Sequence, residues 1–268
     1  MWRIASASAI GTSHIDSGTP CQDSATHELL ATDTGEILII VVADGAGSAA
    51  SAERGSALVA QTITKLLRDY FNGGGTVDAI SREMAVTWLQ ATADVLTQAA
   101  FNAGQKVHDF SSTLLVAIAA ENSNVFIQIG DGAIVVSEGA DEGWAWVFWP
   151  QHGEFANTTN FVVSPNATEL MEFASTRQRI DEVAIFSDGI ENLVLHTASR
   201  TVHAPFFDAM FPPVRQHAPG FAVELSKGLE KYLLSPRICD RTDDDKTLIL
   251  ATRRAAVPVQ DAPDERPA

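Results

Sequence analysis

The sequence has few cysteines and no long hydrophobic run, and each shortage excludes a class of protein. Only Cys21 and Cys239 occur in 268 residues, too few for a disulfide framework, which predicts reduced thiols and a cytoplasmic location. Uninterrupted apolar runs, such as residues 37–43, are far shorter than the roughly 20 residues that span a bilayer. The first six residues lack the apolar segment of a signal peptide.

Basic residues are also scarce. The chain has 18 Lys and Arg against 34 Asp and Glu, a formal net charge of −16 and a pI near 4.7. A nucleic-acid binder needs a basic face that displaces counterions from phosphates, and an anionic membrane surface would repel this protein. Nucleic acids and membranes are therefore not expected as partners. The acidic excess leaves open that some of the carboxylates hold cations.

Hydrophobic patterning predicts an α+β protein. Hydrophobic residues make up 46% of the chain, which is enough for a substantial core. Helical spacing extends over residues 50–71, 77–99, 206–211 and 221–234, and β-rich runs cover residues 37–43, 113–119, 125–129, 133–137, 144–149, 183–186 and 247–251. Strands in blocks around a helix pair indicate antiparallel sheets with segregated helices. No interior linker is visible, so residues 1–252 are expected to form one domain and residues 253–268 a disordered tail.

Acidic residues recur at the ends of the predicted strands. Asp44-Gly45, Asp131-Gly132 and Asp188-Gly189 each follow an apolar run, and residues 243–245 form an acidic cluster before the last strand. Asp23 is a fifth candidate. Carboxylates at strand ends are held by rigid elements, as a site of fixed geometry requires.

Two interpretations of the Asp-Gly pairs stay open. Asp-Gly is a strong hairpin-turn signal, especially at Asp131-Gly132, which has β-rich runs on both sides. Alternatively, the carboxylates converge on cations, because clustered like charges raise one another's pKa unless a cation neutralises them. No pair of His or Cys residues has zinc spacing, and hard oxygen ligands suit Mg²⁺ or Mn²⁺.

The ordered motifs resemble those of the metal-dependent type 2C protein phosphatases, in particular a bacterial branch of that superfamily. The matching segments are residues 11–14 (GTSH), 18–23 (GTPCQD), 44–48 (DGAGS), 111–114 (SSTL), 130–132 (GDG), 187–189 (SDG) and 244–247 (DDKT). Each motif alone is weak, but the ordered set is specific and covers most of the chain. The resemblance implies a four-layer αββα sandwich, with two antiparallel sheets flanked by helix pairs.

The resemblance also implies a reaction, cofactors and partners. The reaction is hydrolysis of phosphoserine or phosphothreonine in proteins, with a hydroxide that bridges two Mg²⁺ or Mn²⁺ ions as the nucleophile. A third ion binds more weakly. The implied partners are a phosphorylated protein substrate and a cognate Ser/Thr kinase.

Metal-binding roles carry over to six positions of this sequence. Asp44 would bridge two ions, Asp23 would act through metal-bound water, and Asp131 would help to bind the third ion. Asp188 and Asp244 would complete the coordination of one of the ions. The implied metal-binding set is Asp23, Asp44, Gly45, Asp131, Asp188 and Asp244.

Two residues of the family pattern are missing. Type 2C phosphatases usually carry an Arg shortly before the Asp23 position that grips the substrate phosphate, whereas residues 16–21 contain none. Some relatives have a His after the first Asp-Gly as a proposed general acid, and here that residue is Ala46. His14 is the obvious local cation or proton donor, so it joins Asp44, Asp188 and Asp244 as a predicted catalytic residue.

Two other functions compete with the phosphatase interpretation. Residues 45–50 fit the dinucleotide-binding pattern G-x-G-x-x-A, but Asp44 would then face a pyrophosphate and no strand with a ribose-binding acid follows. A catalytically weak relative, serving as a regulatory or binding module, is favoured by the missing Arg and by Ala46. The retained acidic set disfavours it, because unused clustered carboxylates repel one another.

Overall fold

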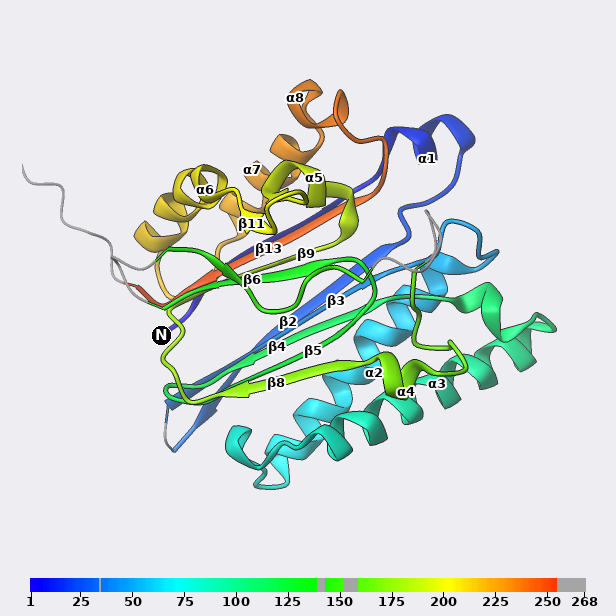
Figure 1. Ribbon diagram of the computed structural model, residues 1–268, viewed down its shortest axis with the longest axis horizontal. Helices are drawn as coiled ribbons and strands as arrows, with labels where there is room; N and C mark the ends of the chain where they lie inside the picture. The colour runs from blue at the N-terminus through cyan, green and yellow to red at the C-terminus, as the bar shows by residue number, and fades with distance from the viewer. Residues whose placement is uncertain (34, 139–142, 152–158, 255–268) are drawn as a thin grey trace, which may run out of the picture.

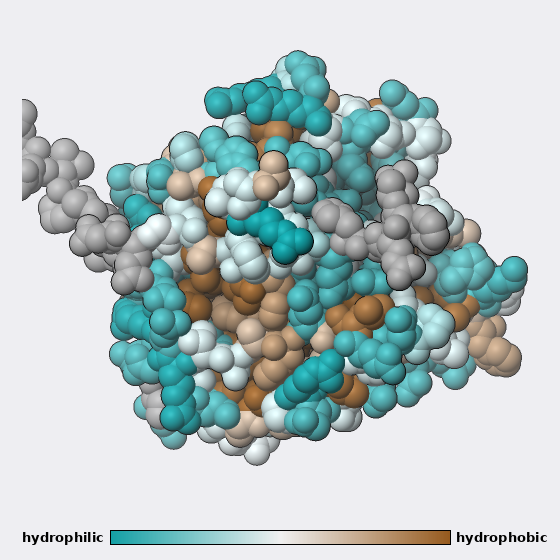
Figure 2. Space-filling model, in the orientation of Figure 1, coloured by the Kyte–Doolittle hydropathy of each residue, from teal (hydrophilic) through white to brown (hydrophobic). Residues whose placement is uncertain are grey.

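Two β-sheets face each other in the computed structural model, which describes residues 1–33, 35–138, 143–151 and 159–254. Helices cover the outer face of each sheet, so the chain forms four layers (Figure 1). The predicted α+β class and the four-layer sandwich are confirmed. Figure 2 shows hydrophobic residues in a band across the middle of one face, with mostly hydrophilic residues over the upper helices.

The first sheet has six strands in the order β12-β1-β13-β9-β6-β7. Neighbouring strands are antiparallel, except that the short β12 runs parallel to β1. The bounds are β1 Arg3–Ala9, β6 Ala133–Ser137, β7 Ala145–Trp146, β9 Glu182–Phe186, β12 Gly220–Phe221 and β13 Lys246–Thr252.

The second sheet is antiparallel throughout, in the order β2-β3-β4-β5-β8. Its strands are β2 Asp23–Thr32, β3 Gly35–Asp44, β4 Leu114–Ala119, β5 Asn124–Ile129 and β8 Glu172–Thr176. Asp23 and Asp44 are register partners in the β2–β3 ladder. The two strands therefore bring both carboxylates to the same end of the sheet.

One long helix pair covers each sheet. Helices α2 (Ala52–Asn72) and α3 (Arg82–Ala103) pack on the second sheet, and α6 (Ala204–Gln216) and α7 (Val223–Leu233) pack on the first. Shorter elements are α1 Thr12–Ser17, η1 Val77–Ala79, η2 Val107–Phe110, α4 Ala167–Leu170, η3 Asp188–Ile190, α5 Glu191–Val194, β10 Leu195–His196, β11 Thr201–Val202 and α8 Pro236–Cys239. α3 begins later than its periodicity predicts because Ser81 caps it, its hydroxyl accepting from the Met84 amide.

Three apolar layers hold the sandwich together. In β3, Ile39 and Val41 pack toward α2 and α3, whereas Leu38 and Ile40 pack between the two sheets. This strand is buried on both faces, as its uninterrupted apolar run predicts. A third layer lies between the first sheet and α6, where Phe207 is fully buried.

Two predicted elements differ from the structure. The aromatic run at residues 144–149 forms only the two-residue β7; beyond it the Val147 amide still donates to the Ile134 carbonyl at 2.9 Å, and Trp144 contacts Phe207 and Phe211 of α6. Asp131-Gly132 does not close a hairpin within one sheet, because it carries the chain from β5 in the second sheet to β6 in the first.

The C-terminal end of the described chain is anchored to the sandwich. Arg253 donates from Nη1 to the Ala120 carbonyl at 2.8 Å, and Arg254 donates from Nη2 to Ser137 Oγ at 2.8 Å. The described chain therefore includes the first two residues of the predicted tail, and residues 255–268 lie outside it. Among the described residues, no helix is both long enough and apolar enough to cross a membrane.

Candidate metal centre and active site

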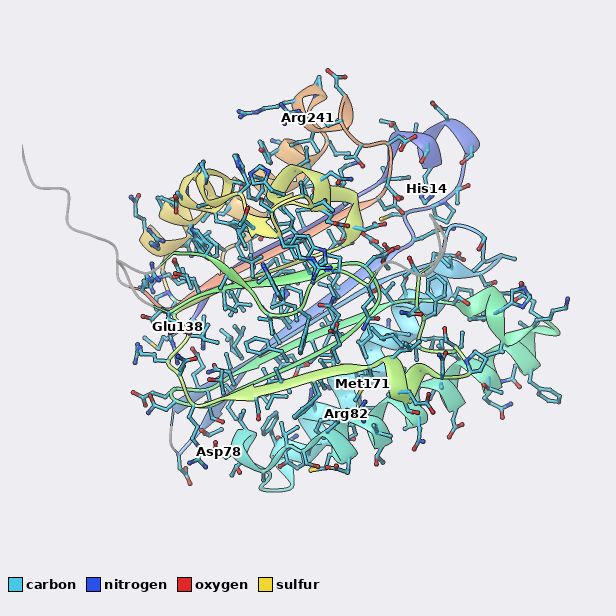
Figure 3. The ribbon with its side chains drawn as sticks, viewed as in Figure 1. His14, Asp78, Arg82, Glu138, Met171 and Arg241 are labelled. Atoms are coloured by element: carbon cyan, nitrogen blue, oxygen red, sulfur yellow. The ribbon has the colours of Figure 1, made fainter. Side chains whose placement is uncertain are left out.

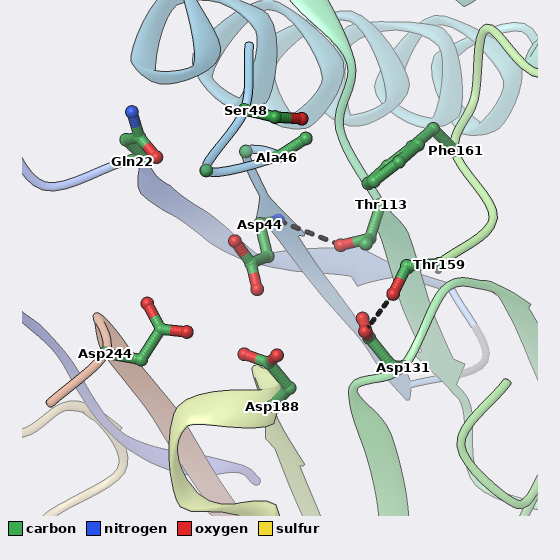
Figure 4. Close-up of a pocket in the computed structure, with 12 residues that line it drawn as sticks. Gln22, Asp44, Ala46, Ser48, Thr113, Asp131, Thr159, Phe161, Asp188 and Asp244 are labelled. Atoms are coloured by element: carbon green, nitrogen blue, oxygen red, sulfur yellow. Dashed lines mark hydrogen bonds between the residues drawn. The ribbon is translucent and has the colours of Figure 1, made fainter. Parts of the chain in front are cut away.

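Four aspartates line one cleft at the end of the sandwich. Asp44 is the last residue of β3, Asp131 and Asp188 lie just after β5 and β9, and Asp244 precedes β13. The cleft has a volume of about 440 Å³. Because β3 and β5 belong to the second sheet and β9 and β13 to the first, the site draws its carboxylates from both sheets (Figure 4).

Three of these carboxylates are close enough to share a cation. Asp44, Asp131 and Asp188 each offer an oxygen, and these oxygens lie within 4.8 Å of one another. Figure 4 shows Asp244 on the opposite side of the same space, near Asp188 and Asp44. Like charges at this separation favour protonation or a bound cation.

The backbone around Asp44 is fixed on both sides. The Asp44 amide donates to Thr113 Oγ1 at 2.9 Å, and the Thr113 amide donates back to the Asp44 carbonyl at 2.8 Å. A Cβ at Gly45 would lie 2.6 Å from the Ala52 carbonyl oxygen. Glycine is therefore required where the end of β3 packs against the start of α2.

Asp23 belongs to the cluster but lies behind the cleft. Its side chain is buried, and its Oδ2 accepts from Ser187 Oγ at 2.7 Å. Ser187 Oγ in turn accepts from the Thr247 amide at 2.9 Å. Asp23 is thus tied to the strands that precede Asp188 and follow Asp244, so the two sheets meet at this carboxylate.

Close backbone packing and side-chain bonds also position Asp188 and Asp131. A Cβ at Gly189 would lie 1.9 Å from the Asp245 carbonyl oxygen, so glycine lets the turn after Asp188 pack on the loop before β13. Asp131 accepts a hydrogen bond from the Thr159 hydroxyl (Figure 4). Both carboxylates are held by elements remote in sequence.

Predicted catalytic residue His14 lies beside the cleft and contacts Asp245. Its Nδ1 is 2.8 Å from Asp245 Oδ2, and Figure 3 labels it beside α1, the helix that carries it. Asp245 also accepts from the amides of Gly11 at 2.6 Å and Gln22 at 2.5 Å. His14 is not among the residues that line the cleft, and its catalytic role stays a prediction.

Burial and mutual repulsion raise the pKa values of three aspartates in the cluster. Burial raises the pKa of Asp23 to about 6, with the charges of Asp245 and Asp244 adding to the shift. Burial raises the pKa of Asp188 to about 8, helped by Asp131 and Asp244. The pKa of Asp44 is raised well above its ordinary value by burial and then by Asp23, Asp188 and Asp131.

These observations fit a bound divalent cation. Asp23 Oδ1 and Asp188 Oδ1 are buried and receive no hydrogen bond from any described residue. A buried carboxylate oxygen without a donor is costly unless a cation satisfies it. The donors are all hard oxygens, which matches Mg²⁺ or Mn²⁺ in chemistry.

Several residues at the site were not among the predicted set. Gln22, Thr113, Thr159 and Phe161 line the cleft, and Asp245 supports it from behind. Gln22 and Thr113 both lie inside motifs of the family pattern, Gln22 directly before Asp23, and these motifs were the available signal. Thr159 and Phe161 come from a segment whose sequence carries no such motif.

Comparison with known proteins places this geometry in a family. A model described as Protein phosphatase 2C matches residues 10–233. A curated relative, Serine/threonine-protein phosphatase 3 of Escherichia coli (strain K12), is 34% identical over 256 residues, which cover 93% of this chain and 98% of the relative.

Solved structures share the fold at low sequence identity. The Serine/threonine phosphatase Stp1 from Staphylococcus aureus superposes with a TM-score of 0.59 at 16% identity, covering 94% of this chain and 95% of that chain. PppA, a key regulatory component of T6SS in Pseudomonas aeruginosa, gives a TM-score of 0.60 at 18% identity, covering 94% of this chain and 97% of that chain. At these identities the structural likeness shows the fold alone.

Proposed function

This chain belongs to the protein phosphatase 2C family, and from that premise we propose which of its residues carry out metal-dependent dephosphorylation of serine and threonine in proteins. Asp44, the Gly45 carbonyl, Asp188 and Asp244 would hold two Mg²⁺ or Mn²⁺ ions. Asp131 would contribute to a third ion. The observation that carries the proposal is the approach of the Asp44, Asp131 and Asp188 oxygens to within 4.8 Å of one another.

Bound ions of this kind supply charge that offsets the phosphoryl oxygens and lower the pKa of a water that serves as the nucleophile. The chain's own residues hold the ligands in place. Thr113 fixes the Asp44 backbone on both its N–H and its C=O. Ser187 orients Asp23 toward the same end of the sandwich. Asp245 ties the segments after β1 and before β2 to the loop before β13, and His14 contacts it.

The environment of Cys21, two residues before Asp23, does not support a mechanism with a covalent cysteine intermediate. Burial, followed by the charges of Asp23 and Asp245, raises the pKa of Cys21 to about 12. The thiolate is the nucleophilic form, so Cys21 is protonated and unreactive at neutral pH. Direct attack by water on phosphorus, without a phosphoenzyme, agrees with this environment.

A phosphorylated protein is the substrate, and we propose that a Ser/Thr kinase acts on the same substrate as the opposing partner. We also propose a cytoplasmic location. Cys21 and Cys239 are both free thiols, which suits a reducing compartment.

Activity on a phosphothreonine peptide, titrated with Mn²⁺, Mg²⁺ and EDTA, tests the proposal. We expect turnover in Mn²⁺ or Mg²⁺, loss to background in excess EDTA, and recovery when Mn²⁺ is added back. Full activity in EDTA would contradict the metal role of the acidic cluster. No turnover with any metal would favour the regulatory or binding module.

A further inference from the structure

The residue before Asp131, Gly130, has a tightly packed backbone that favours glycine. Its φ is +116°, in the region that side chains rarely adopt. A Cβ at Gly130 would lie 2.5 Å from the side chain of Thr113, the residue that also holds the Asp44 backbone. The place of the Asp131 carboxylate therefore depends on how the peptide groups of Gly130 are held.

Gln151 holds both polar groups of the Gly130 backbone. The Gly130 amide donates to Gln151 Oε1 at 3.1 Å, and the Gln151 amide donates back to the Gly130 carbonyl at 3.1 Å. Gln128 Nε2 makes a longer bond to the same carbonyl at 3.4 Å. The turn that carries Asp131 is thus fixed by a residue 21 positions from Gly130.

The carboxamide of Gln151 is itself held in one orientation. Its Nε2 donates to the Leu170 carbonyl at 2.8 Å and to Glu172 Oε2 at 3.1 Å. Its Oε1 accepts from Asn160 Nδ2 at 3.3 Å in addition to the Gly130 amide. A carboxamide nitrogen only donates and its oxygen only accepts. These partners therefore leave the oxygen facing Gly130.

The carboxylate of Asp131 is fixed by the same group of residues. The Thr159 hydroxyl donates to it (Figure 4), and the next residue, Asn160, donates to Gln151. The backbone before Asp131 and its side chain are therefore held together. Asp131 is one of the three aspartates whose oxygens lie within 4.8 Å of one another, and metal ligands must be held to within about 0.5 Å of the productive geometry.

We propose that Gln151 is a positioning residue, which places the Asp131 carboxylate and so sets the affinity of the cation that Asp131 binds. This inference rests on the proposed function of the cleft. Gln151 is not among the described residues that line the cleft, so it acts through Asp131 and touches neither ion nor substrate. A ligand that is already in place binds more tightly, because less conformational freedom is lost when the ion binds.

Mn²⁺ binding followed by electron paramagnetic resonance tests this role apart from turnover. Gln151→Met keeps the length of the side chain and removes its hydrogen bonds. We expect the weakest of the bound Mn²⁺ ions, which we assign to Asp131, to bind about fivefold more weakly, since one hydrogen bond is worth about that factor. The tighter ions should bind within about twofold of wild type. Gln98→Met makes the same change at an exposed position of α3 and should leave every affinity unchanged.

A double-mutant cycle with Asp131→Asn separates positioning from a structural role. Asp131→Asn and Gln151→Met should each lower kcat on the phosphothreonine peptide, and the double variant should be no slower than Asp131→Asn alone. A structural residue would lower kcat further in the Asp131→Asn background. Gln151→Asn, whose shorter side chain stays polar, should show the same selective loss of Mn²⁺ affinity and serves if Gln151→Met does not fold.

Two results would overturn the role of Gln151 while normal turnover by the wild type leaves the proposed function intact. One is a set of Mn²⁺ affinities in Gln151→Met that matches Gln98→Met or is lowered equally for every ion. The other is an additive loss of kcat in the double variant. A wild type that binds no Mn²⁺ and shows no turnover would instead refute the proposed function, and this inference with it.

Discussion

Replacing Asp44 with asparagine is expected to lower kcat/KM on a phosphothreonine peptide by about a thousandfold or more. Asp44 faces Asp131 and Asp188 and lines the cleft with Asp244, so we assign it the ligand position shared by two ions. Losing a metal ligand removes several kcal/mol of charge stabilisation, and each 1.36 kcal/mol is about tenfold in rate. Steady-state kinetics in saturating Mn²⁺ measures the loss.

The Asp44→Asn variant should fold normally, because the bonds that Thr113 makes to residue 44 use only the backbone. Circular dichroism checks this point. Asp94→Asn is the matched control, since Asp94 is exposed on α3, and it should retain wild-type kinetics. Asp44→Asn with more than about a tenth of wild-type kcat/KM would contradict the role of Asp44, because that corresponds to a loss of only about 1.4 kcal/mol.

The metal-free protein is expected to become less stable as the pH rises from about 4 to about 8. Asp23 and Asp188 have pKa values of about 6 and about 8 in the fold, whereas an unfolded Asp has a pKa near 3.9. In that range the folded state binds more protons than the unfolded state, so the free energy of unfolding falls with increasing pH. The stabilising effect of the protonated carboxyls is complete below pH 4 and is lost as the pH passes through these values.

The expected loss in the free energy of unfolding is large for a single cluster of side chains. The shift of Asp23 alone corresponds to on the order of 3 kcal/mol, or roughly 5–10 °C in Tm for a domain of this size. Thermal unfolding in EDTA across this pH range measures it. Asp188→Asn should flatten the slope, which separates the cluster from the general repulsion of a protein with net charge −16. Stability that rises with pH in EDTA, or a slope that Asp188→Asn leaves unchanged, would count against this electrostatic account.

Much of the architecture could be predicted because burial patterns are local. The apolar run at residues 37–43 is a strand buried on both faces, and it ends at Asp44 as the Asp-Gly pair indicates. Asp188-Gly189 follows a buried strand, as its apolar run predicts, and leads into a short helical turn. The resemblance supplied the order of the motifs, and the structure brings Asp44, Asp131, Asp188 and Asp244 to one cleft.

The remaining features depend on contacts between distant residues. The bond from Gln22 to Asp245 spans 223 positions, and neither sequence neighbourhood indicates the other. The aromatic run at residues 144–149 has the composition of a strand, but only Ala145 and Trp146 pair with β6 in the ladder, and Trp144 contacts α6. Asp131-Gly132 has the sequence of a hairpin turn, and only the assignment of β5 and β6 to different sheets makes it a crossing.

We propose that the carboxylates of Asp44, Asp188 and Asp244 hold catalytic divalent cations. Anomalous diffraction from crystals grown with Mn²⁺ tests it directly, because manganese is located without reference to activity. We predict anomalous peaks in the cleft, at coordination distance from oxygens of these three residues, and their loss from crystals of Asp44→Asn. Manganese bound elsewhere on the protein, with the cleft free of anomalous signal at saturating Mn²⁺, would contradict the claim.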